Sequence, residues 1–202
     1  MGLNQNKPSR GRPKTLDREH VLDVAMASYW KEDIGNLSLN EICRRCDISK
    51  PGLYREFLNE DGLMKAVILK YHQEVLSPVQ QMLSHDAPFQ ATLDNLILFA
   101  VSADDSQGAP KGCLLIKMRE AQMHLGEATR AQIDLIQEQA VATYKKWIEC
   151  SQAKGEFTVD MTPEFAATYI DAQLGHASSQ LARGEDPQMV KRILMAALSI
   201  LK

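Results

Sequence analysis

Residues 35–58, GNLSLNEICRRCDISKPGLYREFL, predict two short helices joined by a tight turn. Ser38 precedes Glu41 by three residues, which is the spacing of a capping box, so a first helix is expected to begin at this serine. Residues 46–48 form a break, and the aspartate among them tolerates the left-handed backbone that such a turn usually needs. Ser49 can cap the second helix.

The second helix is expected to have an apolar back and a polar front. Leu53 and Phe57 are spaced i and i+4, so both side chains can point inward. The residues left facing outward are Lys50, Gly52, Tyr54, Arg55 and Glu56. A short helix with a buried back and a mixed basic and aromatic front suits the major groove of DNA.

Together with the helices expected on either side, this segment resembles the DNA-binding head of TetR-family transcriptional regulators. The resemblance covers about residues 15–70 and rests on identity and spacing at these positions: Gly35, Ser38-Leu39-Asn40-Glu41-Ile42, Ile48-Ser49-Lys50-Pro51-Gly52-Leu53-Tyr54-Arg55 and Phe57. It implies an all-α fold of about nine helices. An N-terminal three-helix helix-turn-helix head would be followed by a C-terminal helical domain for ligand binding and dimerisation.

Two acidic residues depart from the family pattern on the expected DNA face. Family members usually carry a lysine just after the turn that follows the phenylalanine, and Glu60 stands there. The residue before the phenylalanine is commonly histidine or another neutral residue, and here it is Glu56. Glu56 either accepts a hydrogen bond from a cytosine amino group or remains a solvated charge.

The first sixteen residues form a basic arm with no acidic residue. They are too polar and too rich in Gly and Pro to fold alone. Such an arm beside a helix-turn-helix reaches phosphates or a minor groove, and its alternative role is that of a solubilising tail. The residues predicted to contact DNA are Arg10, Arg12, Lys14, Ser38, Ser49, Lys50, Pro51, Gly52, Tyr54 and Arg55.

The rest of the chain predicts helices throughout, with no strand alternation. We expect a flexible arm at 1–16, the helix-turn-helix domain at 17–62 and the ligand-binding and dimerisation domain at 63–202. The domain boundary falls within a long helix at 61–84, which Ser77-Pro78 should kink or break. Further helices are expected at about 89–103, 112–124, 127–153, 163–183 and 187 to near the end.

The last two helices are predicted to form a homodimer interface. Residues 172–182, AQLGHASSQLA, are dense in small residues, which let helix backbones approach closely. A four-helix bundle across a two-fold axis would result, although both helices could instead only close the monomer core. The residues assigned to this interface are Ala172, Gly175, Ser179, Ala182, Ile193, Leu194, Ala197 and Leu198.

The resemblance also implies a ligand pocket in the body, for an effector that the sequence does not identify. Methionine and aromatic side chains suit an adaptable apolar pocket, although each of them could equally be plain core. The candidate lining residues are Met82, Phe99, Cys113, Met118, Met123, His124, Trp147 and His176.

Cys113 is the most informative single residue of the body. It stands at an expected helix start close to Lys111, and both features would lower the pKa of a thiol. A Gly-Cys-Leu opening here resembles that of some TetR-type regulators that respond to reactive small molecules. Cys113 is therefore either a reactive sensor or a small residue packed at a helix start.

Composition excludes several classes of protein. The 202 residues carry a net charge of −3 and only four cysteines, of which Cys43 and Cys46 are read as core rather than as metal ligands. No apolar run can span a bilayer, and the start lacks the apolar core of a signal peptide, so we expect a cytoplasmic protein. No catalytic motif, cofactor site or metal site is evident.

We therefore predict a homodimeric transcriptional regulator that binds a pseudo-palindromic double-stranded operator. It is most simply a repressor released by a small molecule bound in the body. Within this class the alternative is a regulator that senses oxidants or electrophiles through Cys113. From another class, the alternative is an all-α small-molecule carrier or enzyme.

Overall fold

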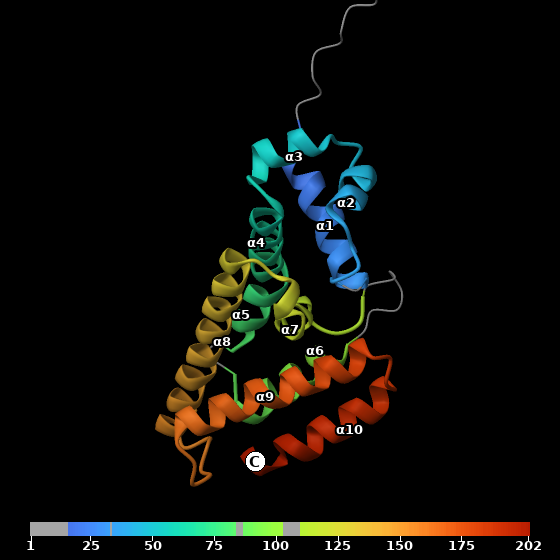
Figure 1. Cartoon of the computed structure of the whole chain (residues 1–202). Helices are drawn as coiled ribbons and strands as arrows, with labels where there is room; N and C mark the ends of the chain where they lie inside the picture. The colour runs from blue at the N-terminus through green and yellow to red at the C-terminus, as the bar shows by residue number, and fades with distance from the viewer. Residues whose placement is uncertain (1–15, 33, 84–86, 103–109) are drawn as a thin grey trace, which may run out of the picture.

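The computed structural model describes residues 16–32, 34–83, 87–102 and 110–202. Within these ranges every regular element is a helix, which confirms the all-α prediction (Figure 1). None of the helices described there is long and apolar enough to cross a membrane. The elements are α1 (Arg18–Lys31), α2 (Leu39–Arg45), α3 (Lys50–Phe57), α4 (Glu60–Tyr71), η1 (His72–Leu76), α5 (Ser77–Met82), α6 (Phe89–Val101), α7 (Leu114–Glu120), η3 (Gln122–His124), α8 (Glu127–Ala153), α9 (Pro163–Ala182), α10 (Pro187–Leu198) and η4 (Ser199–Leu201).

The head is built from α1, α2 and α3, which pack together against α4 at one end of the molecule (Figure 1). The helix caps and the turn that the sequence predicts are present in it. The hydroxyl of Ser38 caps α2 by accepting from the backbone N–H of Glu41, and that of Ser49 caps α3 by accepting from Gly52 N–H. Asp47 has a φ of 52°, so the turn between the two helices takes the expected left-handed conformation.

The long helix expected at 61–84 is interrupted one turn earlier than predicted. α4 ends at Tyr71, a π-helical turn η1 follows, and α5 resumes at Ser77. Because Pro78 has no N–H to donate, the i→i−4 hydrogen bond that its position would make is missing. The π-helical turn η1 stands immediately before this proline, and such turns are a common irregularity where a helix is interrupted.

Buried apolar residues fall into two clusters along the length of the molecule. The first cluster joins α1–α4 to α7 and to the first half of α8. The second joins α5 and α6 to the end of α8 and to α9 and α10. Leu63, Val67 and Tyr71 of α4 belong to the first cluster, so the core of the head extends past residue 62.

α8 is the element that connects the two clusters. It lies beside α4 at its beginning and beside α9 at its end, while α9 and α10 pack together at the opposite end from the head (Figure 1). Within the second cluster the rings of Phe89 and Trp147 are stacked with centroids 4.6 Å apart, and Phe157 meets Phe89 edge to face. The expected helix at 112–124 is divided, because α7 ends at Glu120 and the 3-10 turn η3 follows.

Candidate nucleic-acid interface

α3 has the two faces that its sequence predicts. Leu53 and Phe57 are buried at 0% and 4% relative exposure, while Tyr54 is 41% exposed. Lys50, Pro51 and Arg55 are also exposed. The ammonium of Lys50 lies 5.7 Å from the centroid of the Tyr54 ring, so the front of the helix presents a cation and an aromatic ring together.

The two capping serines remain available to a second partner. Ser38 and Ser49 each accept a backbone N–H at 3.2 Å. Both residues are exposed. A hydroxyl that accepts one hydrogen bond still has its own O–H to donate, so each serine can donate to a phosphate oxygen without losing its cap.

Glu56 has a partner that neither of its two predicted roles included. The guanidinium of Arg18 lies 3.2 Å from its carboxylate and 5.4 Å from the centroid of the Phe57 ring. An ion pair between two exposed side chains adds little to stability. It does, however, compensate the negative charge that Glu56 places beside the basic front of α3. Sequence analysis missed Arg18, because nothing in the local pattern indicates which acid it faces.

The corner between α3 and α4 is unusually tight. Leu58 has a φ of 68° and is 82% exposed, and Asn59 N–H donates to the Phe57 carbonyl at 2.8 Å across it. A Cβ at Gly62 would overlap the same carbonyl oxygen, so this position of α4 requires glycine. Glu60 lies in the first turn of α4, where an acidic side chain favours the helix terminus.

The three arm residues predicted to contact DNA, Arg10, Arg12 and Lys14, lie outside the described residues. The interface that the structure does describe is therefore the front of α3 with the starts of α2 and α3. α3 is a short helix whose back is buried in the core of the head and whose front carries basic and aromatic side chains, so it can enter a major groove.

Comparison with known proteins agrees with this geometry. Residues 21–67, which run from α1 into α4, match the family described as bacterial regulatory proteins, tetR family. The HTH-type transcriptional repressor ComR of Escherichia coli (strain K12) is 31% identical over 111 residues. That alignment spans 54% of this chain and 53% of ComR, so it covers about half of each protein.

Residues 21–67 of this chain form a TetR-family DNA-binding domain.

Solved structures of other proteins share the whole fold. A cysteine mutant of the TetR family transcriptional regulator CifR, complexed with 26-bp double-strand operator DNA, superposes with a TM-score of 0.80 at 21% identity. It covers 95% of this chain and 100% of the CifR chain. The reduced form of NemR from E. coli superposes with a TM-score of 0.73 at 17% identity, over 92% of this chain and 97% of NemR.

The pocket residues predicted for the body are not gathered in one place. Met118 and Trp147 are buried in different clusters. Met123 is 93% exposed, and Met82, Phe99, His124 and His176 are also exposed. Methionine and aromatic content did not identify a common lining, because the helical pattern does not fix which side chains of different helices meet.

A different set of polar residues lies inside the body. Asp171 of α9 accepts a hydrogen bond from Gln137 of α8 at 3.1 Å, and the guanidinium of Arg119 from α7 stands 3.9 Å away. Burial raises the pKa of the Asp171 carboxyl above its ordinary range. Burial also raises the pKa of Tyr144, and the charge of Asp171 adds to that shift. Sequence analysis missed this group, since its members are far apart in the chain and have no common motif.

Cys113 does not have the environment predicted for a reactive thiol. Tyr71 O–H donates to its sulfur at 3.4 Å, and Cys113 N–H donates to the Ser178 hydroxyl at 2.7 Å. Burial raises the pKa of the thiol, and the hydrogen bond from Tyr71 offsets this only in part. The expected lowering of the pKa was therefore wrong, because the sulfur faces the interior of the body.

The small residues of α9 pack against α7 of the same chain. Gly175 lies against Ile116, and the hydroxyl of Ser179 donates to the Glu120 carboxylate at 2.5 Å. A Cβ at Gly112 would meet the backbone and Cβ of Ala182. The close helix approach predicted for a dimer is thus made within the monomer by three of the proposed interface residues.

Exposed apolar side chains on α9 and α10 mark a surface that includes Ile193, one of the predicted interface residues. Leu194 and Leu198 are buried in the second cluster, so their side chains belong to the core of the monomer and not to an exposed dimer interface. Phe165, Met189, Ile193 and Ile200 are 41–56% exposed. Met189 and Ile193 lie on α10 at i and i+4, which places them on one side of that helix, and Ile200 follows in η4.

Proposed function

We propose that this TetR-family chain is a DNA-binding transcriptional regulator, most simply a repressor, that acts as a homodimer in the cytoplasm. The observation that carries this proposal is the front of α3, where Lys50, Tyr54 and Arg55 are exposed above the buried Leu53 and Phe57. A helix with this surface reads base edges, and the capping serines hold its register on phosphates.

The relatives support the same function. ComR is named a transcriptional repressor, and CifR was solved with operator DNA on the same fold. A helix-turn-helix protein normally binds two half-sites about one DNA turn apart, roughly 34–36 Å, so a pseudo-palindromic operator is expected. The exposed apolar side chains of α9 and α10 supply a surface through which a second copy would bring the second head.

The interior of the body supports control by a small molecule. Asp171, Tyr144 and Gln137 place partly buried polar groups next to the apolar residues of the second cluster. A few convergent polar groups in an apolar surrounding are the usual composition of an effector site. A bound effector would release the operator only if it binds the two states of the protein with unequal affinity.

Selection from a pool of randomised DNA duplexes tests the DNA-binding function directly. The dimer should enrich an inverted repeat with half-site centres about one helical turn apart. Binding to the enriched duplex should weaken steeply as salt rises, because phosphate contacts release counterions. Failure to enrich any sequence, with binding equally weak to all duplexes, would instead favour the carrier or enzyme alternative.

The thiol-sensor alternative makes a separate prediction about Cys113. Because burial raises the pKa of this thiol, little thiolate is present near neutral pH, and Cys113 should react with iodoacetamide no faster than Cys150. Mass spectrometry of the native protein measures the labelling rate of each cysteine. Fast labelling of Cys113 accompanied by release of the enriched duplex would contradict this expectation and restore the sensor.

A further inference from the structure

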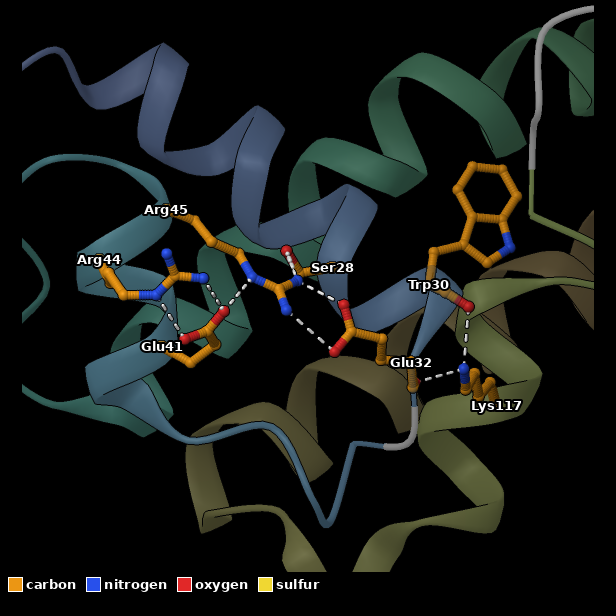
Figure 2. A network of polar contacts seen from close by, with 7 residues as sticks. All are labelled: Ser28, Trp30, Glu32, Glu41, Arg44, Arg45 and Lys117. Atoms are coloured by element: carbon orange, nitrogen blue, oxygen red, sulfur yellow. Dashed lines mark hydrogen bonds and ion pairs between the residues drawn. The ribbon is translucent and has the colours of Figure 1, made fainter.

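One network of polar contacts joins the body to the head at the end of α1 (Figure 2). The ammonium of Lys117, on α7, donates to the backbone carbonyls of Trp30 and Glu32 at 2.8 and 2.5 Å. In the opposite direction, the indole N–H of Trp30 donates to the carbonyl of Gly112 at 2.9 Å. The last carbonyls of a helix have no partner within the helix, so a cation at this end both satisfies them and complements the helix dipole.

The same network continues from α1 into the helix-turn-helix. The carboxylate of Glu32 binds both terminal nitrogens of Arg45, which lies on α2. Arg45 also donates to Glu41 at 2.8 Å and to the hydroxyl of Ser28 at 3.0 Å. A charged group of the body is thereby connected to the helix that precedes the recognition helix (Figure 2).

The carboxylates of this network are held in their ionised form by the arginines. Hydrogen bonds from Arg44 and Arg45 lower the pKa of Glu41 to about 2. The hydrogen bond from Arg45 likewise lowers the pKa of Glu32. A guanidinium that binds two carboxylates from two helices fixes their relative orientation, because its donors have a rigid planar geometry.

A second contact joins the body to the start of α4, the helix on which the head packs. The carboxylate of Asp61, in the first turn of α4, accepts from the backbone N–H groups of Ala128 and Thr129, both at 2.9 Å. The hydroxyl of Thr129 bonds to the same carboxylate, and a Cβ at Gly126 would overlap it. The segment 112–129 therefore holds the head both at the end of α1 and at the start of α4.

α7 is placed to move when the interior of the body changes. Arg119, two residues from Lys117, approaches the partly buried Asp171 of α9 at 3.9 Å. α7 also packs on α9 through Ile116, which lies against Gly175. The helix is only seven residues long and follows Gly112, whose φ is 79°. A short helix with a glycine before it can shift as a unit with little backbone cost.

We infer that Lys117 is a positioning residue that transmits the state of the body to the helix-turn-helix through Glu32 and Arg45. The inference rests on the proposed function, because the coupling controls DNA binding only if the protein binds DNA. The coupling between Lys117 and α2 itself can be measured without DNA. When α7 shifts, Lys117 leaves the carbonyls at the end of α1, Glu32 loses its fixed position, and the pairing that orients α2 weakens. The recognition helix then no longer keeps one orientation relative to the body.

Hydrogen exchange on the full-length protein tests this inference. Lys117→Met keeps the length of the side chain but removes its donors. It should make residues 39–57 exchange about tenfold faster, because the end of α1 loses its bonds to Lys117, Glu32 is no longer held in place, and its pairing with Arg45 of α2 weakens. Exchange in α9 and α10 should stay as in the wild type, since those helices are not part of the network. Lys117→Arg should restore protection, and Lys146→Met, at an exposed lysine of α8, should change nothing.

Two further measurements make the result decisive. With Trp147→Phe, Trp30 becomes the single fluorophore, since the chain has only two tryptophans, and Lys117→Met should shift its emission to the red. Affinity for the enriched duplex should fall about tenfold with the same variant. Unchanged exchange of the head in Lys117→Met, or acceleration spread equally over α9 and α10, would overturn the inference. If the exchange result holds but no duplex is ever bound, the proposed function fails and the coupling does not.

Discussion

Tyr54→Ala and Arg55→Ala should each weaken binding to the enriched operator by roughly 10- to 100-fold, since one good base contact contributes about 1–3 kcal/mol. Both side chains are exposed on the front of α3 and neither belongs to a buried cluster. The melting temperature should therefore stay close to that of the wild type. The loss should be larger for the selected sequence than for an unrelated duplex.

Fluorescence anisotropy over a series of salt concentrations measures this effect. Lys146→Ala, an exposed cation on α8 far from the head in sequence, is the matched control and should bind as the wild type does. Arg55→Ala should also reduce the salt dependence of binding if its guanidinium contacts a phosphate in addition to a base. Wild-type affinity in both head variants would show that α3 does not read DNA.

The head could be predicted from the sequence because its signals are local. The caps at Ser38 and Ser49 and the left-handed Asp47 each depend on neighbours within a few residues, and all three are confirmed. The buried back of α3 follows from the i, i+4 spacing of Leu53 and Phe57. Spacing along one helix determines its faces without knowledge of the rest of the chain.

The polar contacts between distant segments could not be predicted in the same way. Arg18 pairs with Glu56, and Lys117 binds the end of α1, across separations that carry no pattern. With many exposed charges in the chain, each basic residue has several acidic candidates, and tertiary packing alone selects among them. The predicted lowering of the Cys113 pKa was wrong for the same reason. Residues of α4 and α9, which are distant in the sequence, pack around the thiol, and burial raises its pKa.

The small residues of α9 show that a pattern predicting close packing does not identify the helix that packs there. A stripe of Gly, Ala and Ser allows close packing, but it does not state which helix approaches. The structure places Ile116 of α7 in van der Waals contact with this position, so the larger side chain of Gly175→Leu would have to displace Ile116. The exposed apolar side of α9 and α10, which includes the predicted interface residue Ile193, is the surface that remains available to a second copy.

Ile193→Glu should raise the dimer dissociation constant by at least about 100-fold, because it would bury an unpaired carboxylate twice across a two-fold interface. Ile193 is 41% exposed on α10, so the folded monomer should tolerate the charge. Analytical ultracentrifugation should show monomers at micromolar concentration where the wild type is dimeric. These monomers should bind the enriched inverted repeat poorly, because only one head docks at a time.

Leu135→Glu is the matched control for this experiment. Leu135 is 46% exposed on α8, so the substitution has the same chemistry on a surface of similar exposure but different position. It should leave the dimer and its DNA affinity unchanged. If Leu135→Glu gives monomers and Ile193→Glu remains dimeric, the interface lies on α8 and the apolar side of α10 has another role. If both variants remain dimeric, neither face brings the two heads together, and the pairing of half-sites must come from elsewhere in the chain.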